Sequence, residues 1–208
     1  LTLFIALSPW WDRALVTLYM ATFGVFISTI IGFTVGIISF QNKHTANFML
    51  GVCDIFQTFP SFVYLIPVMM LFGVTDTSVL IAVIVYATIP ATRYTIEGLR
   101  SVPEALHDAA TMSGVTKVQR LLKIEFPLAF PHMMLGLNQT IVFALFMVII
   151  GAFIGTEDLG QYILKALSDK KGAGIGLTLG LCVAFIGLIF DHLIRTWVGK
   201  RKKHLGIG

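Results

Sequence analysis

The sequence predicts an all-α membrane protein, a polytopic bundle of about five transmembrane helices. Hydrophobic residues make up 56% of the chain and charged residues only 12%, whereas charged residues account for about a quarter of a typical soluble domain. The apolar residues form runs that approach or exceed the roughly 20 residues that a helix needs to cross a bilayer. The basic residues lie beside these runs and at the C-terminus, which is typical of membrane topology signals rather than of a face that binds nucleic acid.

The candidate spans follow one another along the chain with more polar segments between them. The first run contains no charged residue, the second is interrupted only by Asp54, and the third becomes more polar towards Leu99. The segment 1–6 is apolar but too short to cross a bilayer, so we interpret it as the end of a preceding span. The five predicted spans are 14–40, 46–72, 79–99, 133–154 and 175–194.

The distribution of Lys and Arg predicts the orientation, because short cytoplasmic loops carry an excess of these residues. Placing the segment 101–127 inside puts eleven of the 15 basic residues on the cytoplasmic side. The basic tail 195–208 is then cytoplasmic as well. The four on the outer side are Arg13, Lys165, Lys170 and Lys171.

The cytoplasmic segment 101–127 has the signals of two short helices. Ser101 and Glu104 have the spacing of a capping box, and a glycine at position 114 is a natural helix stop. The first helix would carry small and apolar residues along one side, and a short helix cannot bury such a side without a groove on a partner. These residues are Leu106, Ala109, Ala110 and Ser113.

The second short helix is predicted by a repeat of the capping-box spacing at Thr116 and Gln119. It should continue to Phe126 and be broken by Pro127, because proline removes a backbone donor and restricts the residue before it.

The same segment resembles the cytoplasmic EAA loop of ATP-binding-cassette importer permeases. The order of its residues carries the resemblance, with Asp in place of the usual Glu and Phe126 in place of the usual Leu: Asp108-Ala109-Ala110, Gly114, and the ending Ile124-x-Phe126-Pro127. The resemblance implies a single permease domain over 1–208 with the type I importer permease fold. It also implies that the first loop helix docks on a separate cytoplasmic ATPase subunit. The residues it assigns to this coupling are Glu104, Ala105, Asp108, Ala109, Ala110, Gly114 and Pro127.

Further segments resemble the permeases of glycine betaine/proline betaine importers. They are 10–18, 54–67, 136–150, Leu159-Gly160 and 191–194. The resemblance implies a bacterial inner-membrane protein that works as a pair, with a solute-binding protein outside, ATPase subunits inside and lipid around it. Glycine betaine or a related methylated ammonium compound is the expected solute, and choline, carnitine and trimethylamine N-oxide remain open. The chain departs from the pattern at 156–158, in a loop expected to face the binding protein.

Polar residues inside the second and fourth spans are candidates for the translocation path, because polar groups within a membrane need partners or a cavity. We expect the two groups to face each other across the inner half of the bundle. Each single residue is as well explained by a static interhelical hydrogen bond or a kink. The candidates are Gln57, Thr58, Pro60, Asn138, Gln139 and Thr140.

The sequence contains no phosphate-binding loop of the G-x-x-x-x-G-K-[ST] type and no metal-ligand or hydrolytic constellation. We therefore expect a transport subunit that is not itself an enzyme and holds no cofactor, with ATP and magnesium on the partner. Two other interpretations stay open at this point. An ion-coupled secondary carrier should show internal repeats and buried carboxylates, for which Asp54 is the only mid-chain candidate. A membrane scaffold without transport is the second alternative.

Overall fold

The computed structural model describes residues 10–152, 156, 158–168 and 172–205. Within them every regular element is helical, which confirms the predicted fold class. The long helices are α2 (Trp11–Phe40), α5 (Asp76–Arg100), α8 (Phe126–Gly151) and α10 (Ala173–Leu205). The shorter elements are α3 (Lys43–Thr58), α4 (Phe62–Phe72), α6 (Glu104–Met112), α7 (Lys117–Arg120), the π turn η1 (Leu121–Glu125) and α9 (Leu159–Ser168). The expected end of a preceding span at 1–6 lies outside the described residues.

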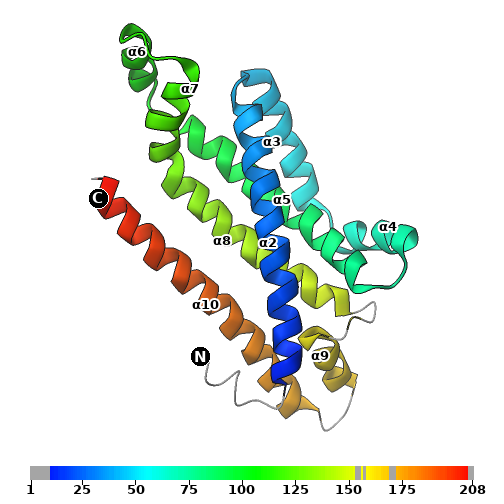
Figure 1. The fold of residues 1–208 in the computed structure, drawn as a ribbon. Helices are drawn as coiled ribbons and strands as arrows, with labels where there is room; N and C mark the ends of the chain where they lie inside the picture. Colours follow the sequence, from blue (N-terminus) through cyan, green and yellow to red (C-terminus); the bar gives the residue numbers. More distant parts are fainter. Residues whose placement is uncertain (1–9, 153–155, 157, 169–171, 206–208) are drawn as a thin grey trace.

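Helix α5 is the centre of the bundle, packed along both α2 and α8, and α10 joins the bundle through α8 and α9 (Figure 1). The core between these helices consists of apolar and small side chains, among them Ala21, Val79, Val83, Ala144 and Val148, all of which are buried. Figure 1 shows α6 and α7 at the upper end of the bundle, where α2 stops and α3 begins. Helix α9 lies at the opposite end, beside the start of α2.

Four helices are long and apolar enough to cross a membrane, and they correspond to four of the five predicted spans. The second predicted span, 46–72, is not one straight helix. It consists of α3 and α4, which meet at an angle of 88°. Phe59 adopts an extended backbone with ψ of 136°, as expected of a residue that precedes a proline. The count of five spans therefore holds only if this bent pair crosses the membrane as a unit.

The second loop helix does not end at Pro127, contrary to the prediction. Residues 117–151 form one continuous helical stretch of 35 residues, in which Pro127 lies in the first turn of α8. Proline has no N–H to donate, and here it follows directly on the π turn η1, where the ordinary α-helical hydrogen-bond pattern is already interrupted. The π turn η1 immediately before α8 widens the helix at this junction. Helix α7 is therefore continuous with a membrane helix, whereas α6 precedes the turn at Gly114.

Close packing of α2 on α5 depends on glycines. A Cβ atom on Gly32 would lie 2.4 Å from the Cβ of Ala91 and 3.0 Å from the carbonyl oxygen of Thr88. A Cβ on Gly51 of α3 would meet nothing within 4 Å. The two glycines therefore differ in what surrounds them, although both lie within helices.

We expect Gly32→Ala to destabilise the protein and Gly51→Ala to stabilise it. Overpacking a close helix contact costs about 1–3 kcal/mol, whereas alanine in place of glycine inside a helix gains roughly 0.5–1 kcal/mol. Thermal unfolding of the purified variants in detergent measures both effects. Equal melting temperatures for the two variants would contradict the packing found here.

Candidate functional site

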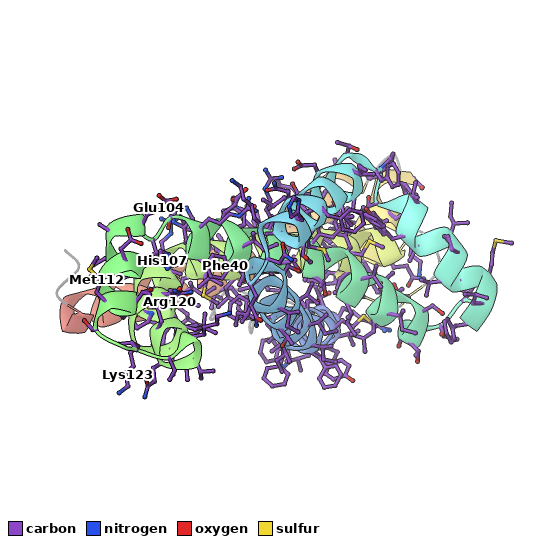
Figure 2. All side chains as sticks on the ribbon, turned by 90° about the horizontal axis from the view of Figure 1, so that it is seen from above. Phe40, Glu104, His107, Met112, Arg120 and Lys123 are labelled. Carbon is purple, nitrogen blue, oxygen red and sulfur yellow. The ribbon has the colours of Figure 1, made fainter. Side chains whose placement is uncertain are left out.

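The candidate coupling helix α6 lies at the tip of the loop 101–127, and Glu104, His107 and Met112 mark its course in Figure 2. It begins after Pro103, and no side chain caps its first turn. The predicted capping box with Ser101 is wrong, because the Ser101 hydroxyl donates instead to the carbonyl oxygen of Gly98 at 2.7 Å. Glu104 in the first turn still suits the positive end of the helix dipole.

The end of α6 and the start of α7 follow the predictions. Gly114 has a φ of +71°, a left-handed conformation that glycine adopts at little cost. The capping box at Thr116 and Gln119 is present: the Gln119 N–H donates to Thr116 Oγ1 at 3.3 Å, and the Thr116 N–H donates to Gln119 Oε1 at 3.1 Å. These contacts fix the direction in which the loop leaves α6.

The exposed side of α6 includes three of the four residues predicted for it, Leu106, Ala109 and Ser113. Ala110, the fourth, is buried, with 4% of its surface exposed. The outward side carries apolar groups, two of them alanines, together with two carboxylates: Glu104, Ala105, Leu106, Asp108, Ala109 and Met112. Such a surface fits a groove on another protein.

On the membrane side, Gln57 belongs to a charged network between α3 and α5. Its Oε1 accepts a hydrogen bond from Arg93 Nη1 at 3.2 Å. Arg93 also forms ion pairs with Asp54 and, at 2.9 Å, with Glu97. The side chains of Arg93, Asp54 and Glu97 are 31%, 59% and 36% exposed. The network therefore lies on an open face of the single chain.

The other path candidates have local or different partners. The Thr58 hydroxyl donates to the carbonyl oxygen of Ile55 at 2.7 Å, and Pro60 lies at the bend between α3 and α4. On α8, Asn138 donates to Asp191 Oδ1 of α10 at 2.9 Å, Thr140 donates to the carbonyl oxygen of Gly136 at 2.9 Å, and Gln139 is half-buried. The structure thus links the α3 group to α5 and the α8 group to α10, rather than to each other.

Aromatic rings continue from the charged network into the bundle. The rings of Phe56 and Tyr64 have centroids 6.0 Å apart, those of Tyr64 and Tyr86 5.1 Å, and those of Tyr86 and Phe143 4.8 Å. This series joins α3, α4, α5 and α8 next to Gln57. Tyr64 and Tyr86 are buried in the core, whereas Phe56 is 39% exposed. Ring faces attract quaternary ammonium groups, so the exposed ring of Phe56 and the donors of Arg93 and Gln57 lie in the same region.

From the sequence, Arg93 was predicted only to mark the cytoplasmic side of the membrane. No role was predicted for Glu97, His107 or Glu125. Arg93 and Glu97 do have the i,i+4 spacing of an ion pair on one helix. The contacts of Arg93 with Asp54 and of Glu125 with His107 join different helices, so no local spacing predicts them. Among the described residues, no group of three or more His, Cys, Asp or Glu side chains is placed to hold a metal ion.

The outer loop that was expected to face a binding protein is partly buried. Asp158 is 0% exposed and Thr156 is 3% exposed, while Glu157 lies outside the described residues. Asp158 Oδ1 accepts the N–H of Gln161 at 3.1 Å and so caps α9, and the Leu159 N–H donates to Thr17 Oγ1 of α2 at 3.2 Å. Part of this departure from the family pattern therefore belongs to the packing of α9.

Burial raises the pKa of Asp158 from 3.8 to about 6. The folded state then holds the proton more tightly than the unfolded state does. The stabilisation is complete below about pH 4 and is lost as the pH rises through 6, with an amplitude on the order of 3 kcal/mol. We expect the melting temperature to fall between pH 4 and 7, and Asp158→Asn to reduce this dependence. The exposed Asp76 provides the control variant Asp76→Asn, and identical pH profiles for the two variants would refute this role of Asp158.

The family model described as "binding-protein-dependent transport system inner membrane component" matches residues 24–204. The trimethylamine N-oxide transport system permease protein TmoV of Ruegeria pomeroyi is 46% identical over 98% of this chain, which covers 31% of TmoV. The glycine betaine transport system permease protein OpuAB of Bacillus subtilis is 32% identical over 93% of the chain, which covers 68% of OpuAB. The chain thus spans about a third of the first of these relatives and two thirds of the second.

Solved structures show the same fold. One titled as an inward-facing conformation of the MetNI methionine ABC transporter superposes with a TM-score of 0.74 at 20% identity, over 89% of this chain and 94% of the other. A structure titled as an amino acid ABC transporter with histidines also gives 0.74, at 16% identity over 90% and 92% of the two chains. At this identity the likeness shows the architecture, which is the predicted type I importer permease fold.

Proposed function

Because this chain belongs to the binding-protein-dependent transport system inner membrane components, we propose that it forms the translocation pathway of an ATP-driven importer for a small methylated ammonium or amine-oxide solute. The observation that carries the solute class is the 46% identity to TmoV over 98% of the chain. Glycine betaine, carnitine and choline permeases are among the other relatives, so the proposal covers solutes that share a methylated nitrogen.

In this proposal α6 is the contact with a cytoplasmic ATPase subunit. Its position at the tip of the loop, beyond the ends of α2 and α5 (Figure 1), leaves its outward side open to a partner. The small side chains of Ala105 and Ala109 would allow a close approach of the partner's groove. ATP binding would draw two such loops together and reorient the spans, as in other hinged two-state assemblies.

A second copy of the chain would complete the pathway. Asp54, Arg93 and Glu97 lie within predicted membrane-spanning segments, with Arg93 about 10 Å from the inner end of α5 and partly exposed. Charged groups at membrane depth face protein or water rather than lipid. This face would therefore line a cavity between two copies, and lipid would cover the apolar outer faces of the helices.

The solute would meet this face on its way inward. Arg93 and Gln57 would offer donors to a carboxylate or N-oxide oxygen, and the ring of Phe56, which is 39% exposed, would face the methylated nitrogen. A solute-binding protein on the outer side would deliver it. An ion-coupled carrier would instead use Asp54 as a proton or sodium site, but Asp54 is already paired with Arg93.

The test is ATP hydrolysis by the permease co-purified with its ATPase subunits and binding protein. We expect hydrolysis to rise when trimethylamine N-oxide, glycine betaine, choline or carnitine is added with the binding protein, and not with methionine. No ATPase in the purified complex, or stimulation by methionine alone, would count against the proposal.

A further inference from the structure

Glu125 is a buried carboxylate at the base of α8, beneath the coupling helix. Its side chain is 2% exposed, and its Oε1 lies 3.0 Å from His107 Nδ1 and 2.8 Å from Arg120 Nε. His107 belongs to α6 and Arg120 to α7, so one carboxylate oxygen joins three elements. Figure 2 shows His107 and Arg120 close together within the loop, whereas Lys123 points away from it.

The π turn explains how Arg120 reaches this carboxylate. Arg120 and Glu125 are five residues apart, and the Phe126 N–H donates to the carbonyl oxygen of Leu121, the five-residue pattern of a π turn. Because helical structure continues from Lys117 to Gly151, Glu125 is fixed within the long helix. Its position therefore follows the membrane-spanning part of α8.

The contact between His107 and Glu125 is a polar link, called the tie below, between α6 and the long helix that contains α8. The outward side of α6 is exposed, and Ala110 is the buried residue of the helix. A buried carboxylate is stable only while its partners stay in place. Separating α6 from α8 would remove the His107 ring from Glu125 and leave Arg120, which donates a hydrogen bond to it, as the remaining partner. This cost opposes independent movement of α6.

We infer that Glu125 is a positioning residue that makes α6 and α8 move as one body, so that displacement of α6 by a partner is passed to the membrane helix. This inference rests on the proposed function. Without the tie, the loop would absorb the displacement at Gly114 and at the π turn. The ATPase would then hydrolyse ATP without moving solute.

The experiment measures solute transported per ATP hydrolysed in proteoliposomes that contain the full complex. The variants are Glu125→Leu, Glu125→Gln and His107→Ala, and the control is Lys123→Ala, an exposed residue of the same π turn. We expect the ratio to fall about tenfold for Glu125→Leu and His107→Ala, while ATP hydrolysis stays within about twofold of the parent. Glu125→Gln keeps an acceptor and should retain most of the coupling, and Lys123→Ala should retain all of it.

The possible results distinguish a failure of the Glu125 tie from a failure of the proposed transport function. An unchanged ratio in both Glu125→Leu and His107→Ala would overturn the inference, and so would a parallel loss of hydrolysis and transport, which signals general damage. His107→Ala carries the test alone if Glu125→Leu fails to assemble, because His107 is 24% exposed. If the unmodified complex shows no solute-linked hydrolysis, the proposed function fails first and the inference falls with it.

Discussion

Ala109→Arg should abolish solute-stimulated ATP hydrolysis while leaving the permease folded in the membrane. Ala109 is exposed on α6, so an arginine there has room in the isolated chain and little effect on its stability. In the complex, the long charged side chain would occupy the space that the partner's groove needs. A loss of about 1.4 kcal/mol in the free energy of docking lowers the affinity for the ATPase subunit tenfold. We expect the affinity to fall by at least this factor.

The matched variant is Ala109→Ser, which stays small and should keep the parent's activity. A second variant, Gly114→Pro, changes the backbone of the loop instead, because proline cannot adopt the φ of +71° found at Gly114. Solute-stimulated hydrolysis, with expression and thermal stability as controls, reports both effects. Normal stimulation in a well-expressed Ala109→Arg complex would show that α6 is not the docking surface.

Arg93→Leu should have the second large effect, on stability and transport together. The substitution leaves Asp54 and Glu97 without their cationic partner at membrane depth. Breaking a buried ion pair costs about 3–5 kcal/mol, and we expect roughly 1–3 kcal/mol here because the groups are partly exposed to the pathway. Uptake should fall by at least about tenfold.

A double variant separates the two roles of Arg93. Arg93→Leu combined with Asp54→Asn removes the unpaired charge on α3, so the melting temperature should recover in part. If Arg93 contacts the solute, uptake should stay low and the transport KM should stay high. Recovery of both stability and uptake in the double variant would assign Arg93 a static structural role only.

Helices α2, α5, α8 and α10 were predictable from the sequence, because each carries an apolar run long enough to cross a membrane. The bend between α3 and α4 was not predicted, because hydropathy carries no information on backbone direction. The one sequence signal for the extended backbone at Phe59 is the proline that follows it, Pro60. Helix α9 was also not predicted: its 10 residues are too few to cross a membrane, and it packs mainly against α10 and α8.

The candidate site was predictable where the signal is local. The Thr116–Gln119 capping box and the turn at Gly114 depend on neighbouring residues, and both are present. The networks around Arg93 and Glu125 join residues 39 and 18 positions apart, Asp54 with Arg93 and His107 with Glu125. Their partners are set by how the helices pack, which no spacing rule within one segment describes. The predicted capping box at Ser101 does not form, because the Ser101 hydroxyl donates its hydrogen bond to the carbonyl oxygen of Gly98.

The most direct test of the central claim is solute uptake into proteoliposomes that contain the permease, its ATPase subunits and the binding protein. We predict that labelled trimethylamine N-oxide or glycine betaine accumulates only when ATP is present on the ATPase side, and that proton or sodium gradients without ATP give no accumulation. Accumulation driven by an ion gradient in the absence of ATP would contradict the account.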